Sequence, residues 1–204
     1  MIAKHSINKQ SAIRKVCVYC ASSRQVDAAY FEDAALLGQT LARNGTTIVY
    51  GGGAAGLMGR VADAALAEGG KVIGVLPGFM NDLEWGHASL TELVIVPDMH
   101  RRKQKMAEGV DAVIALPGGC GTMEELLEVL TWKRLGLFTK PIVMVNTRRY
   151  FDPLIAFLEQ MIREKFMNER HRKMWSVVEN PLQVLEAIQT APKWSSENRN
   201  FAVQ

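Results

Sequence analysis

Residues 111–125 read Asp-Ala-Val-Ile-Ala-Leu-Pro-Gly-Gly-Cys-Gly-Thr-Met-Glu-Glu. The run Asp111–Leu116 is short, apolar and β-branched, which is typical of a strand that is covered on both faces of a parallel sheet. A glycine-rich turn follows, and then a pattern that predicts a helix from about Thr122 to Leu135. A buried strand that runs through a tight turn into a helix is the repeating unit of an α/β fold.

The same alternation extends along the chain in both directions. Further helices are expected over Phe31–Ala42, which ends at a left-handed cap at Asn44-Gly45, over Phe151–Phe166, and after Asn180-Pro181. The sequence therefore predicts a Rossmann-like, doubly wound α/β fold with a mostly parallel sheet of about seven strands and helices on both faces. We expect a single domain over residues 1–204, with frayed termini at 1–14 and 193–204. The other expected strands are Val16–Cys20, Thr46–Tyr50, Lys71–Leu76, Glu92–Val96, Pro141–Val145 and, with a weaker pattern, Trp175–Val178.

A second glycine-rich turn, residues 51–59, follows one of these strands and reads Gly-Gly-Gly-Ala-Ala-Gly-Leu-Met-Gly. Its glycines, Gly52 and Gly53 among them, would let backbone N–H groups approach a phosphate at a helix start. A dinucleotide site is disfavoured, because the next strand ends in Leu76-Pro77-Gly78 and offers no carboxylate for a ribose. A P-loop is excluded, because no Lys-Ser or Lys-Thr pair closes the turn.

The turn at 117–125 allows two interpretations. Thr122 and Glu125 have the spacing of a capping box, in which both side chains only satisfy donors at the helix end. Alternatively, the glycine N–H groups and the Thr122 hydroxyl bind a phosphate. Location favours the second interpretation, because ligands of open parallel sheets bind beyond the carboxyl ends of the strands. Two such turns can hold one small phosphorylated ligand, with Glu125 near its sugar.

A cationic segment, residues 98–106, follows a third strand end and reads Asp-Met-His-Arg-Arg-Lys-Gln-Lys-Met. Such a run is either a solvated face or a counter-charge for an anion in the cleft. On a helix, Arg102 and Met106 share one face, and Met99 and Lys103 share another. Apolar and cationic side chains in alternation would suit a purine joined to a sugar phosphate.

The composition of the chain excludes several classes of protein. The 24 Lys and Arg residues against 21 Asp and Glu give a net charge of +3, which excludes a polybasic coat for nucleic acid. No apolar run reaches the length of a membrane span, and the N-terminus has no signal-peptide pattern, so we expect a cytoplasmic protein without a nucleic-acid or membrane partner. Cys17 and Cys20 lie in an apolar run, which favours buried strand residues over a metal or redox motif.

Three segments in this order, residues 51–59, 99–103 and 117–125, resemble the LONELY GUY family, the cytokinin riboside 5′-monophosphate phosphoribohydrolases that are often mislabelled as lysine decarboxylases. The resemblance covers roughly Val16 to Val178. It implies a homodimer that hydrolyses the N-glycosidic bond of a purine nucleoside 5′-monophosphate, either AMP or N6-prenyl-AMP. The products would be the free base and ribose 5-phosphate, and no metal or organic cofactor is implied.

The resemblance also implies roles for individual residues. The essential arginine and glutamate of the family correspond to Arg102 and Glu125, whereas Arg101 occupies a variable position of the motif. The substrate contacts of the family correspond to Glu84, Lys103, Gly119, Cys120, Gly121, Thr122, Met123, Glu124 and Thr131. The motifs and glycine-rich turns add Gly52, Gly53, Met99 and Gly118 to the residues expected to bind substrate.

The chemistry is compatible with these residue types. Breaking the C1′–N9 bond builds positive charge on the ribose, and Glu125 could stabilise that charge and deprotonate the attacking water. Arg102 could hold the phosphate or orient Glu125, and the sequence leaves both roles open. The main rival hypothesis is a nucleotide-binding or carrier module of the same superfamily, in which Glu125 only caps a helix. A pyridoxal-dependent decarboxylase ranks third, because Lys103 has no recognisable pyridoxal context.

Overall fold

The computed structural model describes residues 12–83 and 85–201. Within these ranges, all seven predicted strands are present, and each strand end lies within one residue of its predicted position. The strands pair in parallel to form one sheet, in the order β4-β3-β2-β1-β5-β6-β7. They are β1 (Lys15–Tyr19), β2 (Thr47–Tyr50), β3 (Val72–Pro77), β4 (Glu92–Val96), β5 (Ala112–Ala115), β6 (Ile142–Val145) and β7 (Ser176–Val178).

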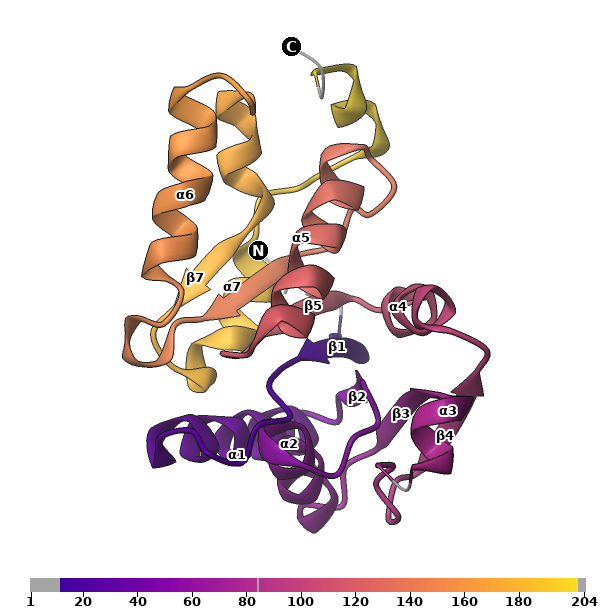
Figure 1. Ribbon diagram of the computed structural model, residues 1–204. Helices are drawn as coiled ribbons and strands as arrows, with labels where there is room; N and C mark the ends of the chain where they lie inside the picture. Colours follow the sequence, from indigo (N-terminus) through magenta and orange to yellow (C-terminus); the bar gives the residue numbers. More distant parts are fainter. Residues whose placement is uncertain (1–11, 84, 202–204) are drawn as a thin grey trace, which may run out of the picture.

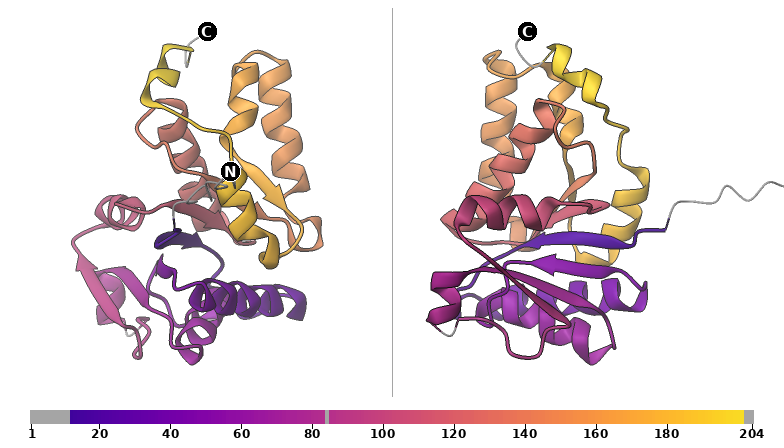
Figure 2. Two further views of the ribbon diagram at one scale, coloured as in Figure 1. Left: turned by 180° about the vertical axis from the view of Figure 1, so that it is seen from behind. Right: turned by 90° about the vertical axis from the view of Figure 1, so that its right-hand side faces the viewer.

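Helices cover both faces of this sheet, as predicted (Figures 1 and 2). One face packs against α1 (Ala28–Arg43), α2 (Gly56–Ala67) and α7 (Val184–Thr190), and the other against α4 (Met99–Ala107), α5 (Cys120–Arg134) and α6 (Asp152–Arg163). Strand β1 shows the alternation that makes this possible: Val16 and Val18 belong to the first core, and Cys17 and Tyr19 to the second. The fold is therefore the Rossmann-like, doubly wound α/β fold expected from the sequence.

The strand order places a topological switch point between β1 and β5. From β1 the chain adds β2, β3 and β4 towards one edge of the sheet, and from β5 it adds β6 and β7 towards the other edge. The connections after β1 and β5 therefore diverge to opposite sides, and a crevice opens at the carboxyl ends of these strands. Both glycine-rich turns end at this crevice.

The helices differ from the predicted ones mainly at their ends. Helix α5 begins at Cys120, two residues earlier than predicted, and its N-cap is Gly119. A capping box between Thr122 and Glu125 is therefore absent, which corrects that interpretation. The left-handed cap at Gly45 is confirmed by its φ of 71°. Helix α6 is shorter than expected, and the last helix begins as a 3-10 turn, Pro181–Gln183, capped by Asn180. A short helix that the pattern did not predict, α3 (Gly78–Asp82), follows β3.

The terminal segments are only partly described, since residues 1–11 and 202–204 lie outside the described ranges. Fraying at both ends and a single domain stay predictions. Within the C-terminal segment, Trp194 is buried, and its Nε1 donates a hydrogen bond to the carbonyl oxygen of Lys133 at 2.7 Å. In the described part of the chain, the helices are too short or too polar to cross a membrane.

Candidate active site

A cleft of about 710 Å³ lies at the switch point, where several loops at the carboxyl ends of the strands meet the starts of α2 and α5. Its walls come from the loop after β1, the first glycine-rich turn, α3 and the loop after it, and one face each of α4 and α5. The lining residues are Cys20, Ala21, Ser22, Arg24, Gly51, Gly53, Ala54, Ala55, Met58, Leu76, Met80, Trp85, Met99, Arg102, Gly119, Cys120, Gly121, Thr122 and Glu125.

Glu125 projects into this cleft from the second turn of α5 and is only 4% exposed. Burial raises the pKa of its carboxyl group to about 7, because the charged form loses hydration, and the nearby Arg102 guanidinium offsets only part of this rise. A carboxyl group with a pKa close to neutrality can accept or donate a proton under physiological conditions. A glutamate that only caps a helix would not need to be buried. The burial of Glu125 thus gives it the pKa of an acid–base group.

Arg102 faces Glu125 from α4, and its guanidinium is fixed by the backbone. Its Nε donates to the carbonyl oxygen of Val75 at 3.1 Å, and one terminal nitrogen donates to that of Gly51 at 2.9 Å. A Cβ atom at Gly51 would come within 2.0 Å of this nitrogen, so the glycine makes the contact possible. The other terminal nitrogen lies 3.8 Å from Oε1 of Glu125, an ion-pair distance that is too long for a direct hydrogen bond.

Two helices begin at the cleft without a side-chain cap. The N-cap of α5 is Gly119 and that of α2 is Ala55, and neither cap residue supplies a side-chain hydrogen bond. The first backbone N–H groups of a helix lack intrahelical partners, and the helix dipole makes this end attractive to anions. Two such helix starts and Arg102 line one cleft, and together they suit a phosphate group.

Part of the lining is apolar. Met58, Met80, Met99 and Trp85 contribute their side chains, and the Trp85 side chain stays 55% exposed. The cleft therefore has a charged part around Arg102 and Glu125 and an apolar part that could receive an aromatic ring.

The loop that carries Trp85 is fixed to the first glycine-rich turn. The backbone N–H of His87 donates to the carbonyl oxygen of Gly52 at 2.9 Å, and the N–H of Ala54 donates to that of Trp85 at 3.1 Å. The His87 ring lies between Asp63 of α2, 3.0 Å from Nε2, and the backbone N–H of Ser89, which donates to Nδ1 at 3.2 Å. These contacts hold Trp85 at the edge of the cleft.

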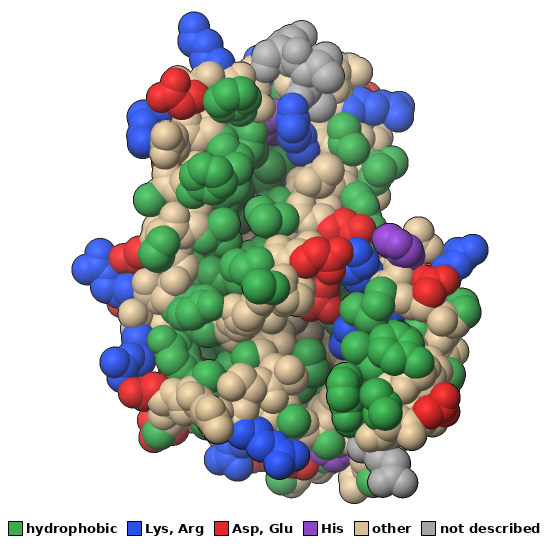
Figure 3. All heavy atoms as spheres, viewed as in Figure 1, with side chains coloured by type: hydrophobic (Ala, Val, Ile, Leu, Met, Phe, Trp, Pro, Cys, Tyr) green, Lys and Arg blue, Asp and Glu red, His purple; other side chains and the backbone are tan. Residues whose placement is uncertain are grey.

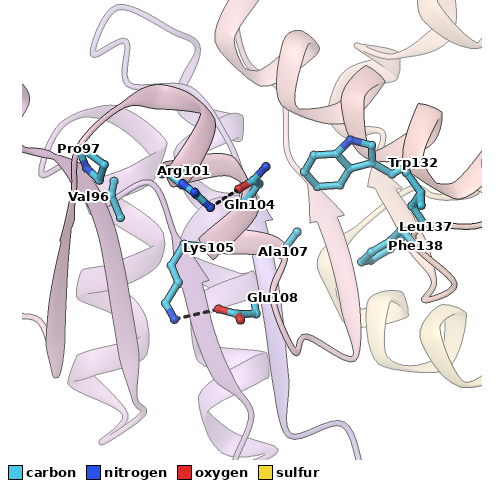
Figure 4. A pocket seen from close by; sticks show the side chains of 10 residues that line it. All are labelled: Val96, Pro97, Arg101, Gln104, Lys105, Ala107, Glu108, Trp132, Leu137 and Phe138. Atoms are coloured by element: carbon cyan, nitrogen blue, oxygen red, sulfur yellow. Dashed lines mark hydrogen bonds and ion pairs between the residues drawn. The ribbon is translucent and has the colours of Figure 1, made fainter.

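The cationic segment does not face the cleft as a unit. Arg102 alone among its four cations lines the cleft, whereas Arg101 and Lys105 line a separate groove of about 650 Å³. Figure 4 shows this groove, with α4 on one side and Trp132, Leu137 and Phe138 on the other. The sequence pattern predicted that these cations would together neutralise one ligand. In the structure the helix directs Arg102 to the cleft, Arg101 and Lys105 to the groove, and Lys103 to Glu124.

The structure brings together most, but not all, of the residues that the sequence predicts to contact substrate. Lys103 points away from the cleft to Glu124 and Glu128. Thr131 lies further along α5, and its hydroxyl donates to the carbonyl oxygen of Leu127. Glu84 falls outside the described residues. The predicted residues that line the cleft are Gly53, Met99, Arg102, Gly119, Cys120, Gly121, Thr122 and Glu125, and those that do not are Gly52, Lys103, Gly118, Met123, Glu124 and Thr131.

Several lining residues were missed by the sequence reasoning. Ser22 and Arg24 follow β1 directly, at the switch point, and both line the cleft. The polar run after the strand Val16–Cys20 was the available signal. However, a loop after a strand can be assigned to a binding site only when the order of the strands is known. Met80 and Trp85 lie in a segment without a recognisable motif.

The cysteines agree with the structural interpretation of the sequence. Cys17 and Cys20 are buried free thiols, and burial raises the pKa of both well above the ordinary value. A thiol in this state is neither a good nucleophile nor a good metal ligand. Cys120 is an exposed free thiol at the first residue of α5.

Comparisons with known proteins connect this geometry to a family. The family model described as "Possible lysine decarboxylase" matches residues 58–188. A cytokinin riboside 5′-monophosphate phosphoribohydrolase of Oryza sativa subsp. japonica is 42% identical over 166 residues, which are 81% of this chain and 69% of that protein. Another of that name, from Arabidopsis thaliana, is 37% identical over 180 residues, which are 88% of this chain and 84% of that protein.

Among solved structures, the molybdenum cofactor carrier protein of Chlamydomonas reinhardtii is similar, with a TM-score of 0.68 and 20% identity over 87% of this chain and 97% of that one. At this identity the likeness shows a shared fold and nothing further.

Proposed function

Because this chain belongs to the family of cytokinin riboside 5′-monophosphate phosphoribohydrolases, we propose that it hydrolyses the N-glycosidic bond of an adenosine 5′-monophosphate, plain or N6-modified, to the free base and ribose 5-phosphate. It would thus be a hydrolase of N-glycosyl compounds. The observation that carries the proposal is the buried Glu125 carboxyl, 3.8 Å from Arg102, in a cleft that is also lined by two helix starts without a side-chain cap.

The geometry supports a division of roles within the cleft. The starts of α2 and α5 and the Thr122 hydroxyl would bind the 5′-phosphate, and the apolar side chains around Trp85 would receive the base. This arrangement brings the C1′–N9 bond close to Glu125. As the bond breaks, positive charge develops on the ribose, which the Glu125 carboxylate stabilises while it takes a proton from the attacking water.

Arg102 would act mainly by orienting the Glu125 carboxylate. Two of its nitrogens are bound to backbone carbonyl groups, and the third faces Glu125. This supports a role in holding the carboxylate in place, and the same nitrogen remains able to bind a substrate oxygen.

The test is an assay for ribose 5-phosphate and free base after incubation with AMP and, separately, with N6-prenyl-AMP. We expect both products from at least one of these substrates. Glu125→Gln should bind AMP but lose on the order of 10²–10⁴ in turnover, the usual contribution of an acid–base group. Release of adenine at nearly the wild-type rate by a folded Glu125→Gln protein contradicts the assignment.

The same assay separates the rival functions. A carrier module would bind the nucleotide without releasing ribose 5-phosphate. A pyridoxal-dependent decarboxylase would need a lysine for a Schiff base, and the described lining of the cleft holds none. The phosphoribohydrolase is therefore the function that the site supports best.

A homodimer is the second part of the proposal. Figure 3 shows hydrophobic side chains gathered between α5 and α6 on the face seen in Figure 1. Leu127 on α5 and Leu135 and Leu137 just after its end are exposed, Leu137 to 73%. Apolar side chains in this number are typical of a surface that another protein covers. We therefore expect a second copy to cover the region around the end of α5.

A further inference from the structure

Two charged contacts join α4 to α5 at consecutive residues of both helices. Arg102 faces Glu125 in the cleft, and the next residue, Lys103, pairs with the preceding one, Glu124. The Lys103 ammonium group also lies 3.3 Å from Oε2 of Glu128, one turn further along α5. Figure 3 shows acidic and basic side chains side by side between these two helices. Lys103, Glu124 and Glu128 thus form a three-charge cluster behind the Arg102–Glu125 pair.

The burial of Lys103 shows that this cluster is more than a surface contact. Its side chain is 5% exposed, although its partners are partly open to solvent. A buried ammonium group is costly unless it is paired, and the two carboxylates raise the pKa of Lys103 despite its burial. Lys103 does not line the cleft, so its charge serves the contact between the helices.

This contact joins two helices that pack on different strands. Helix α4 packs chiefly on β3 and β4, whereas α5 packs chiefly on β1 and on the 3-10 segment Glu169–Met174. Arg102 and Glu125 therefore stand on helices that pack on different strands of the sheet. The carbonyl oxygens of Val75 and Gly51 fix the Arg102 guanidinium on its own side, so the distance to Glu125 depends also on what ties α4 to α5.

We propose that Lys103 is a positioning residue: clamped by Glu124 and Glu128, it ties α4 to α5 and so holds Arg102 in place opposite Glu125. The inference rests on the proposed function for its kinetic readout, but not for its titration readout. Lys103 thereby has a role different from the substrate contact that the motif implies.

The cluster also sets part of the electrostatic field at Glu125. The charged groups that act on its carboxyl are Arg102 and Lys103 from α4 and Glu124 and Glu128 from α5. Of these, Arg102 and Lys103 lower the pKa of Glu125, and the two glutamates raise it. From β1 and its end, Cys17, Tyr19 and Cys20 face the same carboxyl, but burial raises the pKa of all three, so they stay uncharged.

The test compares Lys103→Met, Lys103→Arg and Glu128→Gln. Lys103→Met should lower kcat for AMP by about 10- to 100-fold, the effect of a small misplacement of catalytic groups, with a much smaller change in KM. The pKa of Glu125, followed by carbon NMR of labelled glutamate in the free protein, should rise in Lys103→Met and fall in Glu128→Gln. Lys103→Arg should restore both kcat and the titration towards wild type.

Arg43→Met is the matched control, because it also removes a cation from an ion pair between two elements, with Glu68, but far from the cleft. It should change neither kcat nor the Glu125 titration. A Lys103→Met protein with wild-type kcat and a KM raised about tenfold would mean that Lys103 binds substrate, and would overturn the proposal. An unshifted Glu125 titration in both Lys103→Met and Glu128→Gln would also overturn it.

The outcomes separate this inference from the proposed function. If wild-type protein releases no ribose 5-phosphate, the proposed function fails, while an unshifted Glu125 titration in the variants would still overturn the inference about Lys103. If Lys103→Met does not fold, Glu128→Gln decides: a lowered pKa of Glu125 together with a reduced kcat supports the proposal, and no change in either overturns it.

Discussion

The carboxyl group of Glu125 is buried in the cleft and loses hydration there, which raises its pKa to about 7. The proposed reaction needs the ionised form to accept a proton from water. We therefore expect kcat/KM for AMP to fall about tenfold for each pH unit below this pKa, because the fraction of ionised Glu125 falls in that way. A pH profile of kcat/KM checks this, and an acid limb close to the ordinary glutamate pKa would contradict it.

The same shift has a cost in stability. A folded-state pKa above the unfolded value of 4.5 means that the native protein binds more protons than the unfolded chain between pH 4.5 and about 7. The free energy of unfolding therefore falls as the pH rises through this range, and the loss is complete above it. Glu125→Gln removes the buried charge, so it should raise the melting temperature at about pH 8 but not at about pH 4. A lower melting temperature at about pH 8 would show instead that the carboxylate stabilises the fold.

At the scale of elements, the loop that follows α3 contributes Trp85 to the apolar part of the cleft. Trp85 is held there by backbone pairing with the first glycine-rich turn and by the His87 contacts. Trp85→Ala should lower kcat/KM for N6-prenyl-AMP about tenfold or more relative to AMP, because an apolar substituent loses its contact surface. Phe79→Ala is the control, since Phe79 is comparably exposed on α3 but does not line the cleft. An equal loss for both substrates would contradict a role of Trp85 in selectivity.

The limits of prediction from sequence are also clearest at the level of helices and strands. Apolar runs define strands locally, so β1 to β7 could be predicted almost to the residue. The start of α5 could not, because Gly119 serves as N-cap without any side chain to mark it, and the Thr122–Glu125 spacing imitates a cap. The direction of Lys103 depends on how α4 lies against α5, and a pattern along one helix does not contain that information.

For the whole molecule, the order of the strands is what converts separate motifs into one site. Neighbours in a parallel sheet are chosen by packing between distant segments, so the sequence pattern alone does not place β1 beside β5. Once that pairing exists, the loop with Ser22 and Arg24 meets the starts of α2 and α5. The motifs could therefore indicate a nucleotide, whereas the missed residues needed the fold.

The surface beyond the end of α5 allows a last prediction about the assembly. Leu137 is 73% exposed, so its replacement should leave the folded chain intact and act only on a surface contact. We expect Leu137→Asp to reduce the mass in solution from two chains to one, because a charge in an apolar interface stays without a partner. Leu182→Asp is the control: Leu182 is also exposed but lies beside α1, on the other side of the sheet. Light scattering after size-exclusion chromatography measures the mass of both variants. Dissociation by Leu182→Asp alone would mean that the interface lies on the opposite face.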